Sequence, residues 1–235
     1  MNRFACVFVS ILAMAATAVS AQKETELGSR ILRPSPAEPD YRSKLSENDQ
    51  ARLMVDDFAV CTQQYSKKAV DKALDLIPGE SGSSAALNKL AQPRCLRDAT
   101  LRMPPELLRG ALFRAKVIDE FGDKPLRLSA VPADPTRLAS DLEVRKQLQH
   151  VLLQDFASCV VREKPSAAAA FVIEYAGSAE EQEALDKLIP ALGPCLLDGQ
   201  EVKFSRDALS AQLAEALYHE LVEGTRTDQI AEAAE

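Results

Sequence analysis

The fold is decided by a stretch that occurs twice, LMVDDFAVC at residues 53–61 and VLLQDFASC at residues 151–159. Asp, Phe, Ala and Cys are identical between the two copies, and the three apolar residues that begin each copy, 53–55 and 151–153, are apolar in both. A glycine follows each cysteine after 18 residues, at Gly79 and Gly177. Self-similarity at a fixed offset is the signature of an internal duplication. The sequence therefore predicts two related units.

The similarity continues beyond these stretches. Residues 86–90 match 184–188, Cys95-Leu96 matches Cys195-Leu196, and residues 103–108 match 204–209. Each copy spans about seventy residues, the size of a small domain rather than of one solenoid repeat. We therefore predict a tandem pair and divide the chain as follows: a signal peptide at 1–21, a flexible segment at 22–44, helical unit 1 at 45–122, a Pro-containing linker at 123–137, helical unit 2 at 138–223 and an acidic C-terminal tail at 224–235.

Within each unit the apolar residues recur at helical spacing, as in Leu53, Phe58, Cys61 and Tyr65. The predicted helices cover 45–65 and 104–121 in unit 1, and 138–162, 165–175, 178–188 and 205–222 in unit 2. Ser178-x-x-Glu181 is a capping-box pattern, and Pro190 and Pro194 should break the chain before Cys195. The predicted fold class is all-α, with two tandem homologous units.

The N-terminus has the pattern of an export signal. A short positive segment ends at Arg3, residues 4–19 are apolar, and Val19-Ser20-Ala21 supplies small residues at a cleavage site. Removal of 21 residues from 235 leaves 214, with no transmembrane segment in the mature chain. A retained membrane anchor is the alternative. We expect a periplasmic or secreted protein.

The cysteines fit an oxidising compartment. Cys6 lies in the leader, which leaves Cys61, Cys95, Cys159 and Cys195, an even number in an exported chain. The spacings of 34 and 36 residues favour the pairs Cys61–Cys95 and Cys159–Cys195. The pairing of Cys61 with Cys159 and of Cys95 with Cys195 is the alternative. Structural zinc is disfavoured because C-x-x-C spacing is absent.

Composition and charge exclude several classes. The chain is 46% hydrophobic and 5% aromatic without Trp, which suits an Ala/Leu-rich helical protein. Loss of Arg3 with the leader changes 28 basic and 35 acidic residues to 27 and 35, so the net charge changes from −7 to −8. That charge argues against nucleic acid as a partner. None of the nine glycines are spaced for phosphate binding, and no cofactor is predicted.

Asp57 and Asp155 are the polar candidates, because both copies place an aspartate before Phe-Ala-x-Cys. Paired carboxylates can divide acid and base roles, but a salt bridge or a hydrogen bond to a loop is the preferred interpretation. His219 with Glu215 could form a metal or general-base site on one helix face. Neither His219 nor His150 recurs in the other copy, so a structural role is favoured, and we predict no catalytic or metal-binding residue.

The strongest resemblance lies in unit 2, at FAxCVV (156–161), GSxEE (177–181), PCL (194–196) and FSR (204–206) through LAEALY (213–218). At these residues the chain resembles uncharacterised exported proteins of α-proteobacteria. Unit 1 departs from the pattern, with Thr62-Gln63 in place of Val160-Val161. The resemblance implies a signal peptide and a helical, cysteine-paired module, and it supplies no activity.

These observations favour a non-catalytic binding or structural module of the cell envelope, whose partner is another envelope protein or a peptide. The alternative is an envelope hydrolase that uses Asp57 and Asp155 in a cleft between the two units. An interfacial membrane-associating protein is a weaker alternative, because the net charge is negative.

Overall fold

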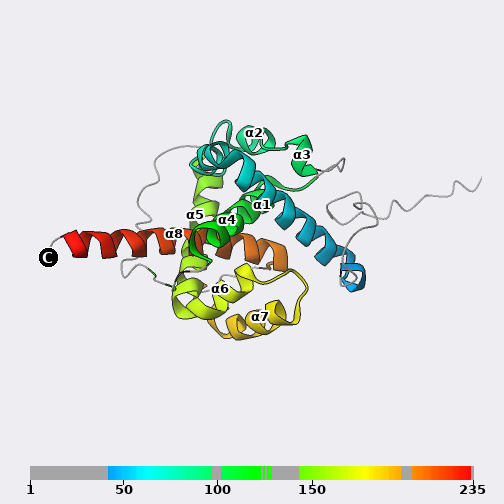
Figure 1. Ribbon diagram of the computed structural model, residues 1–235. Helices are drawn as coiled ribbons and strands as arrows, with labels where there is room; N and C mark the ends of the chain where they lie inside the picture. Colours follow the sequence, from blue (N-terminus) through cyan, green and yellow to red (C-terminus); the bar gives the residue numbers. More distant parts are fainter. Residues whose placement is uncertain are drawn as a thin grey trace, which may run out of the picture.

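The computed structural model describes residues 42–96, 102–122, 124, 126, 128, 143–196 and 203–233, and every regular element in these ranges is a helix (Figure 1). The predicted all-α fold class is confirmed. A short 3-10 helix, η1, precedes eight α-helices. The elements are η1 (Arg42–Lys44), α1 (Glu47–Leu74), α2 (Ser83–Asn88), α3 (Pro93–Leu96), α4 (Pro105–Phe121), α5 (Glu143–Glu163), α6 (Pro165–Ile173), α7 (Ala179–Leu192) and α8 (Arg206–Ala233).

The predicted signal peptide (1–21) lies outside the described residues, as do most of segment 22–44 and most of the linker. Asp98 and Asp198, which recur after the second cysteine of each copy, also lie outside them. The proposed unit boundaries therefore stay predictions.

The ends of several helices follow local chemistry. The hydroxyl of Ser178 accepts a hydrogen bond from the Glu181 amide at 3.0 Å, as the capping-box pattern predicts. The Glu181 carboxylate then accepts from the Gly177 amide at 2.8 Å, one residue before the position expected for a complete box. Gly79 and Gly177 both have positive φ, 94° and 79°, and both lie in the turns that follow a helix.

A break in the helix occurs at equivalent places in the two aligned stretches. In α1 the backbone leaves helical geometry at Ser66 (φ −139°, ψ 31°), and Lys164 (φ −138°, ψ 60°) separates α5 from α6. Pro165 follows Lys164 and disfavours helical geometry there, so the break is complete. Lys67 follows Ser66 and keeps its amide N–H, so α1 is only kinked. The duplication itself stays a prediction from the sequence.

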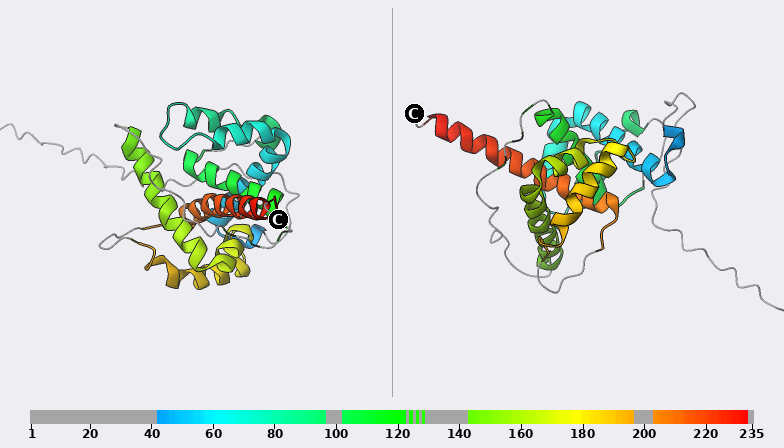
Figure 2. Two further views of the ribbon diagram at one scale, coloured as in Figure 1. Left: turned by 90° about the vertical axis from the view of Figure 1, so that its left-hand side faces the viewer. Right: turned by 90° about the horizontal axis from the view of Figure 1, so that it is seen from below.

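Two expected helix ends are wrong. The chain does not break at Pro190, because α7 continues to Leu192; Pro190 lies in the last turn, where the loss of one backbone hydrogen bond is tolerated. The last helix does not end near Val222 but continues to Ala233 through the segment expected to be a tail. The hydroxyl of Thr225 donates to the Leu221 carbonyl, and Ala and Glu, good helix formers, follow. Figure 2 shows this end of α8 projecting from the other helices.

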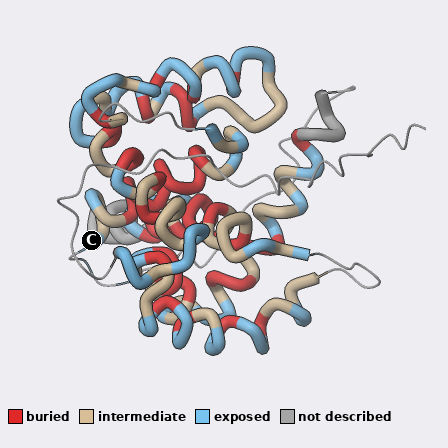
Figure 3. The backbone as a smooth tube through the Cα atoms, turned by 90° about the vertical axis from the view of Figure 1, so that its right-hand side faces the viewer, coloured by how far each residue is buried: buried red, intermediate tan, exposed pale blue. Residues whose placement is uncertain are grey.

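The core lies where α4 and α8 cross. α4 packs against α1 and α8, and α8 also packs against α5 and α6, so one continuous apolar core joins both predicted units. Figure 3 shows the buried residues concentrated in the interior of this assembly. At the crossing, a Cβ atom on Gly110 would overlap the Cβ of Ala211. Only glycine at position 110 therefore permits this approach.

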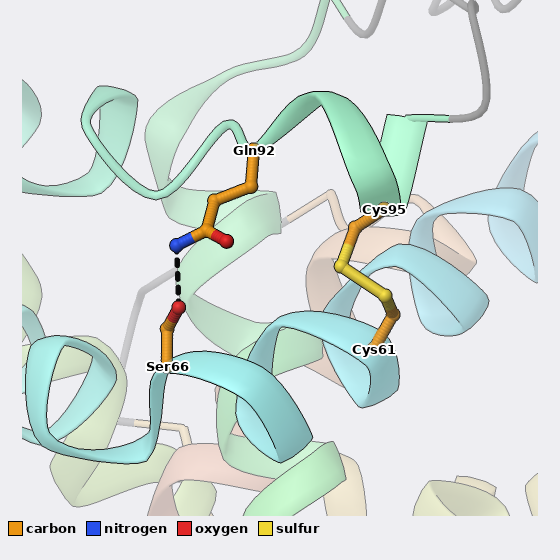
Figure 4. The surroundings of a disulfide bond; sticks show 4 residues. All are labelled: Cys61, Ser66, Gln92 and Cys95. Atoms are coloured by element: carbon orange, nitrogen blue, oxygen red, sulfur yellow. Dashed lines mark hydrogen bonds between the residues drawn. A yellow bond between two sulfur atoms is a disulfide. The ribbon is translucent and has the colours of Figure 1, made fainter.

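Both predicted disulfides are confirmed. Cys61–Cys95 joins α1 to α3, and Cys159–Cys195 joins α5 to the turn after α7, each with a Cα–Cα distance of 5.7 Å. Near the first bridge, the Gln92 amide donates a hydrogen bond to the Ser66 hydroxyl (Figure 4). The bridge holds the α2–α3 segment to α1 before the kink, and this hydrogen bond holds it at the kink itself.

Candidate functional site

A cavity of about 680 Å³ lies between α1, α4 and α8, and α6 and α7 complete its wall. Val55, Leu107, Ala111, Phe171 and Ala208 form much of its apolar lining. Gly110 and Ala211, at the helix crossing, also belong to it. The volume is in the range of small-molecule sites, and a few polar groups within an apolar wall are typical of such sites.

Arg52, on α1, is held on several sides by acidic residues. Its terminal nitrogens form a two-pronged contact with the Glu181 carboxylate, and its Nε lies 2.9 Å from Oδ1 of Asp207. Its Nη1 lies 3.2 Å from Oδ1 of Asp49. Glu181 is almost completely buried and accepts further from the Gly177 amide. All three guanidinium nitrogens are therefore engaged within the protein.

Arg114, on α4, is held by the end of α6. Its Nε donates to the Val172 carbonyl at 2.7 Å, and its Nη2 donates to the carbonyls of Ile173 at 2.8 Å and Glu174 at 3.3 Å. The last carbonyls of a helix lack partners within the helix and carry partial negative charge, so a cation is favourable there. Arg114 thus secures α6 to α4.

Asp56 faces the cavity beside Arg114. Its Oδ2 lies 3.6 Å from Nη1 of Arg114, beyond hydrogen-bonding distance. Burial raises the pKa of Asp56, and the charges of Arg114 and Arg52 offset this only in part. Burial likewise raises the pKa of Asp207 despite its contact with Arg52. For Asp56, whose side chain is 18% exposed, the shift indicates a carboxylate that water solvates poorly.

The cavity wall carries more negative than positive groups. Five carboxylates line it, against the two guanidinium groups, so the carboxylates are in excess by three. The carboxylates belong to Asp56, Glu106, Glu174, Glu181 and Asp207. Of these, Glu181 and Asp207 pair with Arg52, whereas Asp56, Glu106 and Glu174 accept no side-chain hydrogen bond from the described part of the chain.

The candidates chosen from the sequence do not line this cavity. The side chains of Asp57 and Asp155 are exposed and lie outside the lining. Neighbouring atoms still cover Asp155 in part, and this desolvation raises its pKa. Asp56, the sequence neighbour of Asp57, lines the cavity instead. Recurrence could not identify Asp56, because the aligned residue in the second copy is Gln154, whose amide donates to Gln212 of α8 at 2.8 Å.

The two histidines lie on either side of one buried carboxylate. Nε2 of His150 is 3.4 Å from Oε1 of Glu215, and Nε2 of His219 is 4.0 Å from the same atom. Glu215 is also paired with Arg109, whose Nε and Nη2 lie 2.9 and 2.6 Å from Oε1. Within the described residues, no group of three or more His, Cys, Asp or Glu side chains is arranged to hold a metal ion.

The Glu215 ion pair predicts acid sensitivity. Burial alone would raise the pKa of Glu215, but the hydrogen bond from His150 and the charge of Arg109 outweigh it and lower the pKa to about 2, from 4.5. A carboxylate with a lowered pKa stabilises the fold above its unfolded pKa, and the stabilisation is lost as the pH falls. We expect wild type to lose about 3 kcal/mol relative to Glu215→Gln between pH 5 and pH 2.

Urea unfolding of both proteins at several pH values in this range measures the difference. Asp56 and Asp207 have raised pKa values, so their contribution to the free energy of unfolding increases as the pH falls. Both proteins share this contribution, and subtracting the value for Glu215→Gln from the value for wild type removes it. A difference between the two proteins that does not change with pH would contradict the role assigned to Glu215.

Comparison with known proteins finds no matching family model, no matching curated protein and no matching solved structure. No helix in the described ranges contains a stretch long and apolar enough to cross a membrane.

Proposed function

We propose that the protein is an exported, non-catalytic binding module of the cell envelope, and that the cavity between α1, α4 and α8 is its ligand site. The two disulfides support the compartment, because such bridges persist in oxidising environments. The signal-like N-terminus and the resemblance to exported α-proteobacterial proteins agree with this. An envelope protein or peptide as partner stays a prediction from the sequence.

One observation carries the proposal of a ligand site: other groups of the protein hold the polar side chains of the cavity wall in place. Arg52 and Arg114 are held by Glu181 and by the α6 carbonyls, so the wall needs no ligand to order it. Ser205, also in the lining, accepts a hydrogen bond from the Ala208 amide as the cap of α8. A preformed site loses little conformational entropy on binding, which favours affinity.

Filling the cavity should abolish binding of a small apolar probe. We expect the neutral dye N-phenyl-1-naphthylamine to bind wild type saturably at one site, with increased fluorescence. Ala208→Trp places an indole in the cavity wall and should weaken this binding at least tenfold. Dye titration with each purified protein measures the effect, and circular dichroism checks the helix content.

Ala179→Trp is the matched control, because Ala179 is exposed at the start of α7 and does not line the cavity. The chain has no native Trp, so both variants gain a single indole. Equal dye affinity in the two folded variants would reject the cavity as the ligand site.

A further inference from the structure

The cationic and anionic side chains of the cavity differ in how many hydrogen-bond partners the protein supplies to them. The guanidinium group of Arg52 is occupied by Glu181 and Asp207, and Nε and Nη2 of Arg114 are occupied by the α6 carbonyls, which leaves Nη1 of Arg114 facing Asp56. Within the described residues, the one cationic partner of the Asp56 carboxylate is Nη1 of Arg114, at 3.6 Å. A half-buried carboxylate that accepts no hydrogen bond is costly, because neither water nor a donor replaces its hydration fully.

We propose that the cavity binds a small organic cation, a primary ammonium group on an apolar body, with Asp56 as the carboxylate that its charge contacts. This inference rests on the proposed function. The ammonium group brings the donors that Asp56 lacks, and Glu106 and Glu174 add negative charge nearby. Met103, Leu107 and Ala208, which are partly exposed, offer apolar surface to the body of the ligand.

An anionic ligand is disfavoured by the same geometry. To bind it, Arg52 would have to leave Glu181, which is almost completely buried, and would leave that carboxylate unpaired. Arg114 has only Nη1 left to offer, because its Nε and Nη2 hold the carbonyls at the end of α6, and Nη1 lies 3.6 Å from the Asp56 carboxylate, which would repel an anion. The remaining wall would repel the anion, because carboxylates exceed guanidinium groups by three.

The volume favours a small molecule as the occupant. About 680 Å³ is large enough to hold a ligand of drug-like size within a single site. Burial matters for the charge as well, because an ion pair gains more where water is excluded than on an exposed surface.

Three ligands of equal length and different charge test the inference. 4-Phenylbutylamine, 4-phenylbutan-1-ol and 4-phenylbutyrate are titrated at pH 7 against the dye complex of the full mature protein, and direct calorimetry measures the amine alone. We expect the amine to bind at least tenfold more tightly than the alcohol, and the carboxylate to bind most weakly. Asp56→Asn should reduce the preference for the amine over the alcohol to about twofold or less.

Asp57→Asn is the matched control, because it removes the same charge one residue away, from an exposed side chain outside the cavity. It should keep the preference for the amine. If Asp56→Asn fails to fold, Glu106→Gln replaces it, since Glu106 is an exposed residue of the same wall and should reduce the preference by a smaller factor.

The outcomes separate the two proposals. Suppose that Ala208→Trp abolishes dye binding, but that the three ligands bind equally or the carboxylate binds most tightly. The proposed ligand site then stands, and the proposal that it binds a cation is overturned. An equal loss in Asp56→Asn and Asp57→Asn also overturns it. Calorimetric binding of the amine that Asp56→Asn weakens supports both proposals even without dye binding, and the absence of any amine or dye binding overturns both.

Discussion

Replacement of Glu215 by Leu is expected to lower the free energy of unfolding by about 3–5 kcal/mol, because it leaves a buried cation without its partner. Arg109 is 6% exposed and Glu215 is 3% exposed, so water cannot replace the lost carboxylate. The remaining neighbours of Arg109 are the Leu76 carbonyl, at 2.9 Å from Nη1, and the Phe113 ring. Urea unfolding at pH 7 measures the loss.

The double variant Arg109→Met/Glu215→Leu separates the cost of the unpaired charge from the cost of the missing pair. Apolar residues of similar volume often replace a buried ion pair at little cost, so the double variant should recover at least half of the loss. Glu183→Leu, which removes an exposed i,i+4 partner of Lys187, should change stability by less than about 1 kcal/mol. A double variant as unstable as Glu215→Leu would show that the unpaired Arg109 charge is not the cause.

Loss of either disulfide is expected to cost about 4 kcal/mol. The bridged residues are separated by 34 and 36 positions, and closure of loops of this length stabilises a fold by about that amount in the chain-entropy model. We therefore expect Cys61→Ser/Cys95→Ser and Cys159→Ser/Cys195→Ser to be destabilised to a similar degree, as urea unfolding measures. The variant that lacks both bridges should not unfold cooperatively at 37 °C, because the combined loss approaches the whole stability of a small domain.

Dithiothreitol provides the control for the bridges. It should lower the stability of wild type to that of the variant with all four serines, and it should leave that variant unchanged. Free thiols at the four positions in the untreated mature protein, found by peptide mapping without reduction, would contradict both the bridges and the proposed compartment.

The sequence sufficed for features that depend on local chemistry. The even number of cysteines and their spacings identified both bridges, and Ser178 predicted the start of α7 from its own hydroxyl. The acidic residues that end the chain predict a tail after Val222, but α8 continues through them because their helix propensity is high. Pro190 predicts a break in the chain, but it lies in the last turn of α7, and the helix ends two residues later at Leu192.

The candidate site was beyond the sequence because its contacts join distant residues. Arg114 meets the α6 carbonyls some sixty positions away, and Arg52 meets Glu181 across 129 positions. No local pattern marks such pairs. The search for recurrence selected Asp57, whose counterpart is identical, and passed over Asp56, which lines the cavity.

The contact of Gly110 with Ala211 limits how the cavity can change shape. These two residues belong to its lining. Gly110 has no side chain and Ala211 has only a methyl group, so no side chain can move aside to bring α4 and α8 closer. The helices can tilt about this contact as about a pivot, but they cannot approach further. Admission of a bulkier ligand therefore depends on such tilting, or on movement of α1 and α7, rather than on compression of the crossing itself.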